Sequence, residues 1–296
     1  MKNLFMIVNP HGGLKKGLRI LEKVKPIFQQ KKINLKILET EYAGHAQKFS
    51  KELDFKNFDG LCAIGGDGTI HEAINGLMLN PNLEKMTIGF LPGGTGNSFL
   101  HDLNAETYSK AISKLITPKI KKIDVLKLEL KNEVAYSFNI VGWGLVSDIN
   151  ILSEKLRFLG AARYTIASIY YIFRKKLRKA TIIIDGQVRK DNYLFIMCLN
   201  TIHTGKGMKA APNAKLDDGL LDIILLDSKI SIIGLLFLLP KIFTGKHIES
   251  KYIDYLQAKS LSIKPSIDEI LNIDGENKLK TPVKVSVLPQ KISIFY

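Results

Sequence analysis

The sequence predicts an α/β protein with an N-terminal Rossmann-like domain on a parallel sheet and a C-terminal, mainly antiparallel β-sandwich domain. Three observations support this fold class. Strand and helix patterns alternate over the first part of the chain, glycine-rich turns follow three apolar strands, and apolar and charged residues alternate after Pro118. A chain of 296 residues suits two domains that each bury a core.

The first domain is expected at residues 1–120. Four short apolar runs have the character of buried parallel strands, at residues 4–8, 33–38, 61–64 and 87–91. Four segments have the apolar spacing of amphipathic helices, at residues 16–30, 45–53, 70–79 and 105–116. Because each strand is followed by a helix, we expect a parallel sheet covered on both faces.

The second domain is expected at residues 121–296, with the option that the last strand returns to the first domain. Leu126, Leu128 and Leu130 alternate with charged residues, as in a strand with one face in water. The dipeptide Asp185-Gly186 predicts a hairpin turn. Further strands are expected at 193–199, 221–226, 260–264, 270–273, 283–287 and 292–295, and helices at 151–179 and 230–243.

The segment 65–69, Gly-Gly-Asp-Gly-Thr, lies between an apolar strand and a helix. Glycines in such a turn let the backbone approach a ligand closely, and the helix N-terminus behind them attracts anions. Asp67 would repel a phosphate unless it holds a magnesium ion or accepts a proton from an attacking hydroxyl. The segment therefore indicates phosphoryl transfer, with an ordinary tight turn as the structural alternative.

Two further glycine-rich turns strengthen this interpretation. Residues 9–13 read Asn-Pro-His-Gly-Gly, residues 92–97 read Pro-Gly-Gly-Thr-Gly-Asn, and each segment follows an apolar strand. Because ligands bind open α/β sheets at the carboxyl ends of the strands, we expect the three turns to form one site. The chain has neither the Gly-x4-Gly-Lys-Ser/Thr phosphate loop nor the Gly-x-Gly-x-x-Gly dinucleotide motif, which disfavours two common nucleotide folds.

The charge of the chain favours anionic partners. The formal net charge is +15 and the sequence pI is about 9.6, which suits a protein that contacts nucleic acid, anionic lipid headgroups or phosphorylated substrates. An AT-rich genome, which raises the use of lysine codons, is the alternative explanation of the positive charge.

The cysteines and the hydropathy bear on the compartment. Cys62 and Cys198 lie in apolar strand-like runs, which predicts buried thiols and a reducing environment. The sequence shows no signal-peptide pattern and no apolar stretch long enough for a transmembrane helix. We therefore expect a cytoplasmic protein.

One helical segment combines an apolar body with a basic end. Residues 164–173 are apolar and aromatic, and residues 174–179 contain five Lys and Arg. A basic cluster beside an apolar face is typical of proteins that settle on an anionic membrane. Cations favoured by the dipole of an ordinary helix C-terminus are the alternative.

Three other segments carry residues that a plain sheet does not require. Arg157 and Arg163 could bind phosphates bidentately or form surface ion pairs. The acidic turn at 217–219 could hold a divalent ion or be a solvated turn. The turn at 274–276, Asp-Gly-Glu, could join the nucleotide site, with a plain hairpin turn as the alternative.

Together these motifs resemble the lipid kinase family whose catalytic domain is shared by diacylglycerol, sphingosine and ceramide kinases. The resemblance covers nearly the whole chain, through motifs at residues 9–13, 65–69, 92–97, 217–219 and 274–276. The Gly-Gly-Asp-Gly turn also occurs in the related NAD kinases and phosphofructokinases. The Ser-Glu-Lys segment at 153–155, with the arginines that follow, is similar to the sphingosine and ceramide kinase branch.

The resemblance implies an ATP-binding domain of NAD kinase and diacylglycerol kinase type, followed by a lipid-binding β-sandwich. It implies that Asp67 is catalytic, as a proton acceptor or a metal ligand. The residues implied to bind ATP are Asn9, Pro10, His11 with its turn to Gly13, Thr40, Gly65, Gly66, Gly68, Thr69, Glu72, Gly93, Gly94, Thr95, Arg157, Arg163, Asp274, Gly275 and Glu276. The acidic turn resembles a secondary magnesium site of bacterial diacylglycerol kinases, with Asp218, Lys215 and Leu220 as the implied ligands.

One departure from the family pattern concerns the substrate. Sphingosine kinases tend to carry Asp-x-Asp before the Ser-Glu-Lys segment, and the second aspartate pairs with the substrate amine. Here the pair is Asp148 and Asn150. A neutral amide at Asn150 forfeits the charge-assisted hydrogen bond to an ammonium group. We therefore expect a neutral lipid, diacylglycerol or ceramide, unless Asp148 binds the amine of a sphingoid base.

The sequence thus predicts an ATP- and Mg²⁺-dependent kinase that phosphorylates a lipid hydroxyl at the membrane surface. We expect no nucleic-acid partner, and a homodimer is left open. An NAD kinase-like enzyme with a soluble substrate is one rival, although it would not need the apolar-basic segment at 164–179. A non-catalytic lipid-binding protein is the other, and the intact Asp67, Asn97 and Glu276 argue against it.

Overall fold

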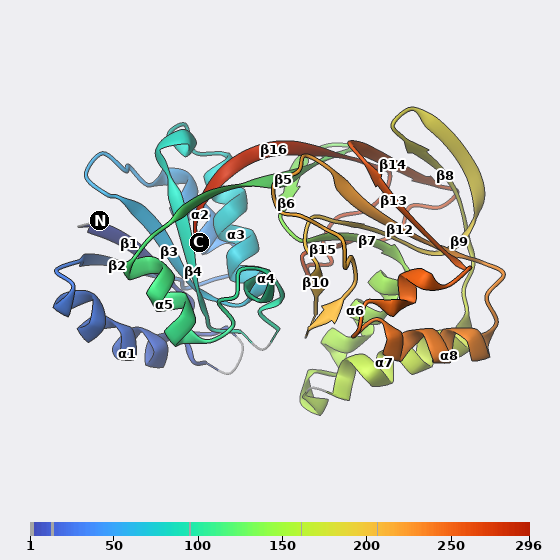
Figure 1. The fold of residues 1–296 in the computed structure, drawn as a ribbon, viewed down its shortest axis with the longest axis horizontal. Coiled ribbons are helices and arrows are strands. Elements are labelled where there is room, and N and C mark those ends of the chain that lie inside the picture. The colour runs from blue at the N-terminus through green and yellow to red at the C-terminus, as the bar shows by residue number, and fades with distance from the viewer. Residues whose placement is uncertain (1–2, 13–14, 95, 161, 206) are drawn as a thin grey trace. The chain divides into compact units, whose positions relative to one another are not determined.

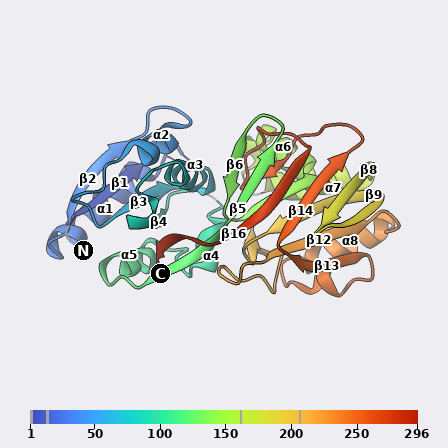
Figure 2. The same ribbon diagram turned by 90° about the horizontal axis from the view of Figure 1, so that it is seen from above.

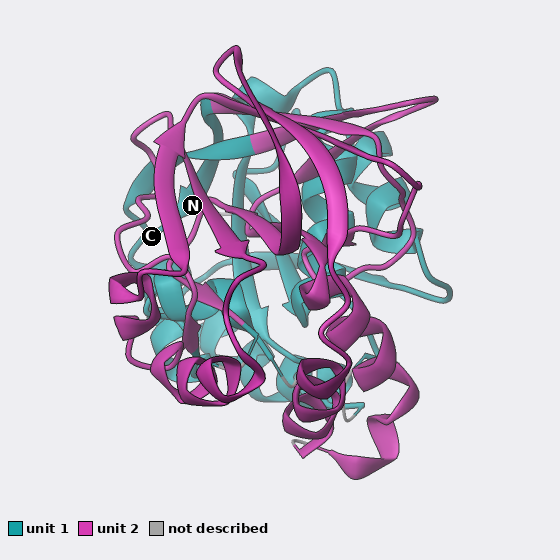
Figure 3. Cartoon of the chain, turned by 90° about the vertical axis from the view of Figure 1, so that its right-hand side faces the viewer, with its two compact units in different colours: residues 1–125, 205–207, 289–296 teal, residues 126–204, 208–288 magenta. Residues whose placement is uncertain are grey.

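The computed structural model of the chain describes residues 3–12, 15–94, 96–160, 162–205 and 207–296. The chain divides into two compact units, coloured separately in Figure 3. Unit 1 comprises Met1–Val125, Gly205–Gly207 and Pro289–Tyr296, and unit 2 comprises Leu126–Thr204 and Met208–Leu288.

Unit 1 is built on a parallel sheet, as predicted (Figure 1). β1 (Asn3–Val8) lies between β2 (Asn34–Glu39) and β3 (Gly60–Gly65), and β3 pairs with β4 (Thr87–Pro92). The C-terminal end of β16 (Val283–Phe295) adds to β4 in parallel. The strands of this sheet other than β2 are almost entirely buried, because both faces are covered.

The helices of unit 1 follow the predicted order with two differences. They are α1 (Gly17–Gln30), α2 (His45–Glu52), α3 (Asp67–Met78), α4 (Ser98–Asp102) and α5 (Tyr108–Ile116), with a 3-10 turn at Leu83–Lys85. α1 packs beside α5, and α2 packs beside α3. α3 begins at Asp67 rather than at residue 70, because its first turn is polar and does not show in the apolar periodicity. The short α4 was not predicted.

Unit 2 consists mainly of antiparallel strands, as predicted (Figure 2). Its main sheet has the order β13-β12-β9-β8-β14-β16. The strands are β5 (Ile120–Leu130, shared with unit 1), β6 (Val134–Ser137), β7 (Ile140–Gly144), β8 (Arg178–Ile184), β9 (Gln187–Leu199), β12 (Leu221–Asp227), β13 (Ile253–Ala258), β14 (Ser260–Pro265) and β15 (Asn272–Ile273), with a small hairpin of β10 (His203–Thr204) and β11 (Met208–Lys209). Asp185-Gly186 forms the predicted hairpin turn between β8 and β9.

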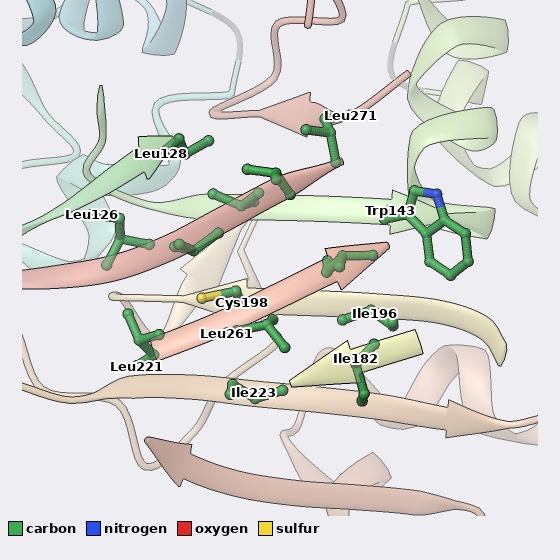
Figure 4. Close-up of a cluster of buried hydrophobic side chains, with 14 of the residues drawn as sticks. Leu126, Leu128, Trp143, Ile182, Ile196, Cys198, Leu221, Ile223, Leu261 and Leu271 are labelled. Atoms are coloured by element: carbon green, nitrogen blue, oxygen red, sulfur yellow. The ribbon is translucent and has the colours of Figure 1, made fainter. Parts of the chain in front are cut away.

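Alternating residues of β9 belong to two different cores. Ile196 and Cys198 belong to the core of the sandwich, together with Trp143 of β7 (Figure 4). Phe195, Met197 and Leu199 belong to a second core that the helices of unit 2 complete. This period-two division of side chains lets one strand serve both layers.

The prediction that both cysteines are buried thiols is confirmed. Cys62 and Cys198 are free and fully buried, and this burial raises the pKa of each thiol. A buried thiol with a raised pKa is a poor nucleophile.

The predicted helix at 151–179 is wrong in its extent. The segment divides into α6 (Leu145–Lys155), a 3-10 turn η2 (Arg157–Leu159) and α7 (Ala162–Arg174), and β8 has already begun at Arg178. The predicted helix at 230–243 is α8 (Ile232–Lys241). Within the described part of the chain, no helix combines the length and apolar character needed to cross a bilayer.

Candidate active site

The structure brings the three glycine-rich turns of unit 1 together. They follow β1, β3 and β4, which are neighbours in the parallel sheet, so the turns lie at one edge. The amide of Gly93 donates a hydrogen bond to the carbonyl oxygen of Gly65 at 2.7 Å. The amide of Asn9 donates to the carbonyl oxygen of Ile64 at 3.1 Å. Main-chain hydrogen bonds therefore join each outer turn to the central strand.

The contact between two of these turns requires glycine. A Cβ atom on Gly94 would lie 2.4 Å from the Cα of Gly66, and a Cβ atom on Gly65 would lie 2.4 Å from the Cβ of Thr69. A side chain at Gly94 would force the turns apart, and one at Gly65 would displace the first turn of α3. Because the turns carry no side chains there, they present main-chain amides to a ligand.

Asp67 is the first residue of α3 and is partly exposed. A Cβ atom on Gly96 would lie 2.9 Å from its Oδ2, and the Ser98 hydroxyl oxygen lies 3.1 Å from the same oxygen. The carboxylate is thus held against the turn that follows β4. Around it, the first amides of α3 form the partial positive charge that attracts phosphate.

Asn9 and Asn97 fix the turns that they begin or end. Asn9 Nδ2 donates to Thr69 Oγ1 at 3.0 Å, and Asn9 Oδ1 accepts from the amide of His11 at 3.0 Å. Asn97 Oδ1 accepts from the amide of Gly94 at 3.1 Å, and its Nδ2 donates to the carbonyl oxygen of the same residue at 3.0 Å. Both side chains replace water as partners of the turn backbone.

Glu72 and Thr40 have structural contacts of their own. Glu72 accepts from the amides of Gly44 at 2.7 Å and Ala46 at 3.3 Å, so it holds the start of α2 against α3. Thr40 is buried, and its amide donates to the carbonyl oxygen of Val8 at 2.9 Å. The other implied ATP-binding residues of unit 1 are His11, which is exposed, and Pro10 and Gly68, which are half-buried, whereas Gly13 and Thr95 lie outside the described residues.

The two candidate arginines belong to unit 2 and share one carboxylate. Arg157 forms an ion pair with Glu154, and Nη1 of Arg163 lies 3.3 Å from Oε1 of Glu154. The Arg157 side chain is 73% exposed, whereas that of Arg163 is 15% exposed and stacks on the Tyr164 ring. The exposed pair of Arg157 with Glu154 contributes little to stability, so the Arg157 guanidinium group is weakly held.

Asp274 and Gly275 form a two-residue hairpin turn with positive φ angles of 52° and 96°. The Asp274 carboxylate is buried and accepts hydrogen bonds from the Ser137 hydroxyl at 2.7 Å and from the amide of Ile140 at 3.0 Å. It therefore fixes the connection between β6 and β7. Glu276 follows the turn, and its Oε2 lies 3.0 Å from Nζ of Lys278.

Asp148 belongs to a partly buried ion cluster, centred on the buried Arg178, that the sequence did not suggest. Its Oδ2 lies 2.5 Å from Nη2 of Arg178, whose Nε lies 2.6 Å from Oε2 of Glu269. Burial raises the pKa of Asp148, and the nearby Arg178 charge opposes that shift. Asp148 and Glu269 also border a cavity of about 290 Å³, together with Asp268 and Lys280.

Asn150 is buried and holds the hairpin turn after β15. Its Nδ2 donates to the carbonyl oxygen of Gly275 at 2.8 Å and to Oδ1 of Asn277 at 3.2 Å. The side chain thus links α6 to the turn that begins with Asp274.

The acidic turn before β12 is compact. Oδ1 of Asp218 accepts from the amide of Leu220 at 3.1 Å, and Gly219 has a φ angle of 72°. Among the described residues, no group of three or more His, Cys, Asp or Glu side chains is placed to hold a metal ion. Asp218, Lys215 and Leu220 stay predicted ligands of a metal ion at this turn.

Comparison with known proteins identifies both parts of the chain. Residues 3–128 match the family described as diacylglycerol kinase catalytic domain, and residues 139–296 match the YegS C-terminal NAD kinase beta sandwich-like domain.

Curated and solved relatives agree with these matches. Sphingosine kinase 1 of Arabidopsis thaliana is 29% identical over 93% of this chain and 68% of its own length. Diacylglycerol kinase of Bacillus subtilis is 28% identical over 93% of this chain and 90% of its own length. The crystal structure of a diacylglycerol kinase from Bacillus anthracis str. Sterne has a TM-score of 0.78 at 28% identity, and covers 100% of this chain and 97% of its own. The chain therefore belongs to the lipid kinase family that carries the diacylglycerol kinase catalytic domain, and it is a kinase.

Proposed function

We propose that the chain transfers the γ-phosphate of ATP to the hydroxyl group of a membrane lipid, with Asp67 as the proton acceptor. The observation that carries the proposal is the Asp67 carboxylate at the N-terminus of α3, held against the glycine turn after β4. The lipid oxygen forms a bond to the γ-phosphorus, the bond to the β-γ bridging oxygen breaks, and ADP leaves. The lipid proton passes to Asp67.

ATP and Mg²⁺ fit the chemistry of these residues. The close-packed glycines expose main-chain amides, which bind phosphate oxygens without a side chain in the way. Asn9 and Thr69 brace the two turns, and Arg157 and Arg163 are the proposed cationic ligands from unit 2. A divalent ion supplies the charge that offsets the phosphates during transfer. A second ion is proposed at Asp218, with Lys215 and Leu220.

A neutral lipid, diacylglycerol or ceramide, is the proposed acceptor. A lipid amine needs a carboxylate partner in a partly desolvated site, since an unpaired buried charge is costly. Asn150 has no charge, and Asp148 is already paired with Arg178 at 2.5 Å. Neither residue therefore supplies a free carboxylate to an ammonium group.

Attachment to an anionic membrane is part of the proposal. The basic segment after α7 contains Arg174, Lys175, Lys176 and Lys179. Arg178 is excluded from this role, because it is buried between Asp148 and Glu269.

A homodimer stays a prediction, which sedimentation of the purified chain would test.

The decisive experiment offers labelled ATP and Mg²⁺ with a panel of acceptors. Diacylglycerol, ceramide, sphingosine and monoacylglycerol are supplied in vesicles, and NAD is supplied in solution. We expect transfer to diacylglycerol or ceramide above transfer to sphingosine. Transfer to NAD alone would support the soluble-substrate rival, and no transfer to any acceptor would contradict the proposed function.

A further inference from the structure

α7 exposes an apolar stripe on the side that a water-facing helix normally makes polar. Ile166, Ile169, Tyr170 and Phe173 follow the i, i+3, i+4, i+7 spacing of one helix face. Their exposed fractions are 44%, 41%, 45% and 62%. This stripe is not the core-facing side of the helix, since Ala167, Ser168 and Ile172 are the buried residues of α7.

α8 repeats the arrangement. Ile233, Leu236 and Phe237 follow the same spacing and are 66%, 37% and 72% exposed, whereas Leu235 and Leu238 are buried. α8 is thus apolar on both its inner and its outer side. A helix of this kind is normally buried all round in a soluble protein.

The two helices lie against each other and share one core. α7 packs beside α8, and Figure 1 shows them side by side along the same side of the unit 2 sheet. Ile172 of α7 and Leu235 of α8 belong to the same buried cluster. Both exposed stripes therefore lie away from a common core. We call the two stripes together the α7–α8 face (Ile166, Ile169, Tyr170, Phe173, Ile233, Leu236 and Phe237).

The segments that contain α7 and α8 carry an excess of positive charge. Residues 155–184 contain eight Lys and Arg and no Asp or Glu, and residues 228–248 contain three Lys and no Asp or Glu. Elsewhere the chain carries 28 acidic residues. Glu154 and Glu269 pair with four of these cations, and the others leave a net positive charge beside the apolar side chains. Such a surface complements an anionic bilayer, in which headgroups meet the cations and acyl chains meet the apolar groups.

We propose that the α7–α8 face inserts into the interface of an anionic bilayer, with α8 contributing as much as α7. The inference deepens the proposed function, because a kinase with a membrane lipid as acceptor must reach that lipid in the bilayer. It goes beyond attraction by the basic segment after α7. The apolar contribution makes part of the binding independent of salt, and it assigns the insertion to named side chains on both helices.

The test measures binding of the full chain to vesicles without ATP or substrate. Phosphatidylcholine vesicles, with and without phosphatidylglycerol, are sedimented at low and high NaCl. Phe173→Ser on α7 and Phe237→Ser on α8 should each weaken binding about tenfold, since each removes one large apolar side chain from the interface. Ile120→Ser is the matched control, because Ile120 is 64% exposed but lies on β5 in unit 1, and it should bind as the wild type does.

Fluorescence locates the insertion directly. The chain has one tryptophan, Trp143, which is fully buried and gives a constant background. Phe237→Trp should show a blue-shifted emission when anionic vesicles are added, and Ile120→Trp should not. Wild-type binding by Phe237→Ser, or an emission of Phe237→Trp that vesicles do not change, would overturn the proposal.

Two further measurements distinguish membrane insertion from loss of kinase activity and from dimerisation. Phe237→Ser should keep wild-type transfer to a short-chain, water-soluble diacylglycerol, so a kinase failure and a docking failure are distinguished. Sedimentation without vesicles tests whether a second copy of the chain covers the α7–α8 face instead. A wild-type dimer that Phe237→Ser dissociates, with unchanged vesicle binding, would assign the face to that dimer and overturn the membrane proposal.

Discussion

The hydroxyl oxygen of Ser98 lies 3.1 Å from Oδ2 of Asp67 and 2.9 Å from the carbonyl oxygen of Gly205. Ser98 is buried and begins α4. A serine hydroxyl has one proton, so it can donate to only one of these two acceptors at a time. Donation to an ionised Asp67 orients the carboxylate, and a protonated Asp67 can donate to Ser98 while Ser98 turns to Gly205.

We therefore predict that Ser98→Ala lowers kcat about tenfold or more while the KM for ATP stays near the wild-type value. The reason is that a hydrogen bond to a charged group contributes roughly 1.5–3 kcal/mol. Ser98→Thr keeps the hydroxyl and should recover most of the activity. Steady-state kinetics of the three proteins, with melting temperatures to verify folding, check this. An alanine variant as fast as the wild type would remove Ser98 from the positioning of Asp67.

Asp67→Asn should cut turnover about 100-fold or more without unfolding the protein, because loss of a general base costs that order of rate. The asparagine amide is nearly isosteric with the carboxylate and leaves the glycine turns unchanged. Single-turnover phosphoryl transfer measures the effect, and Asp102→Asn on α4 is a carboxylate control outside the turns. A folded Asp67→Asn protein with near wild-type turnover would eliminate Asp67 as the proton acceptor.

Arg178→Gln should destabilise the protein by about 1–3 kcal/mol, because it leaves the partly buried carboxylates of Asp148 and Glu269 without the buried guanidinium group that they share. Lys176→Gln is the matched control. Lys176 also pairs with Glu269, at 2.7 Å, but its side chain is 60% exposed, so its loss should cost less than about 1 kcal/mol. Urea unfolding of both variants measures the difference, and equal losses would contradict the assignment of Arg178 as the buried centre of the cluster.

The same variant has a predicted pH dependence. Burial raises the folded-state pKa of Asp148, so the folded protein binds this proton more tightly than the unfolded chain does. The contribution of Asp148 to stability is therefore greatest below the ordinary aspartate pKa and falls as pH rises through the raised folded-state value. Removal of Arg178 takes away the charge that opposes this shift. The destabilisation of Arg178→Gln should accordingly be larger at neutral pH than near pH 4.

The parallel sheet and the glycine turns could be predicted because their signals are local. An apolar run of five residues followed by a glycine turn marks a buried strand and its end, and the order of the runs determines the parallel topology. α4 escaped prediction because its five residues are too few to show a helical period. β16 was expected as two strands, because polar residues interrupt its apolar pattern where it passes from one unit to the other.

The contacts of the second-half candidates could not be predicted, because they depend on residues far away in the sequence. Asn150 contacts Gly275, which lies 125 positions later, and Asp148 meets Arg178 and Glu269 from two other elements. Residue type alone leaves such side chains open to substrate. Once the partners are known, Asn150 has a structural task that the family pattern does not reveal.

The substitution Asn150→Asp tests both tasks of this residue. A carboxylate cannot donate to the carbonyl oxygen of Gly275 or to Oδ1 of Asn277, so the variant should lose about 1–3 kcal/mol of stability. It also places a negative charge where sphingosine kinases carry one, and the ratio of kcat/KM for sphingosine to that for diacylglycerol or ceramide should rise about tenfold or more. Asn150→Ala loses the same donor without gaining a charge, and it should be destabilised without changing preference.

Asp148 is the competing partner for an amine, and Asp148→Asn decides between the two residues. Because Asp148 is paired with Arg178, we expect this variant to leave the preference for a neutral lipid unchanged. If the wild-type enzyme instead prefers sphingosine and Asp148→Asn abolishes that preference, Asp148 leaves Arg178 to bind the amine. In that outcome Asn150 has only its structural task at the turn after β15.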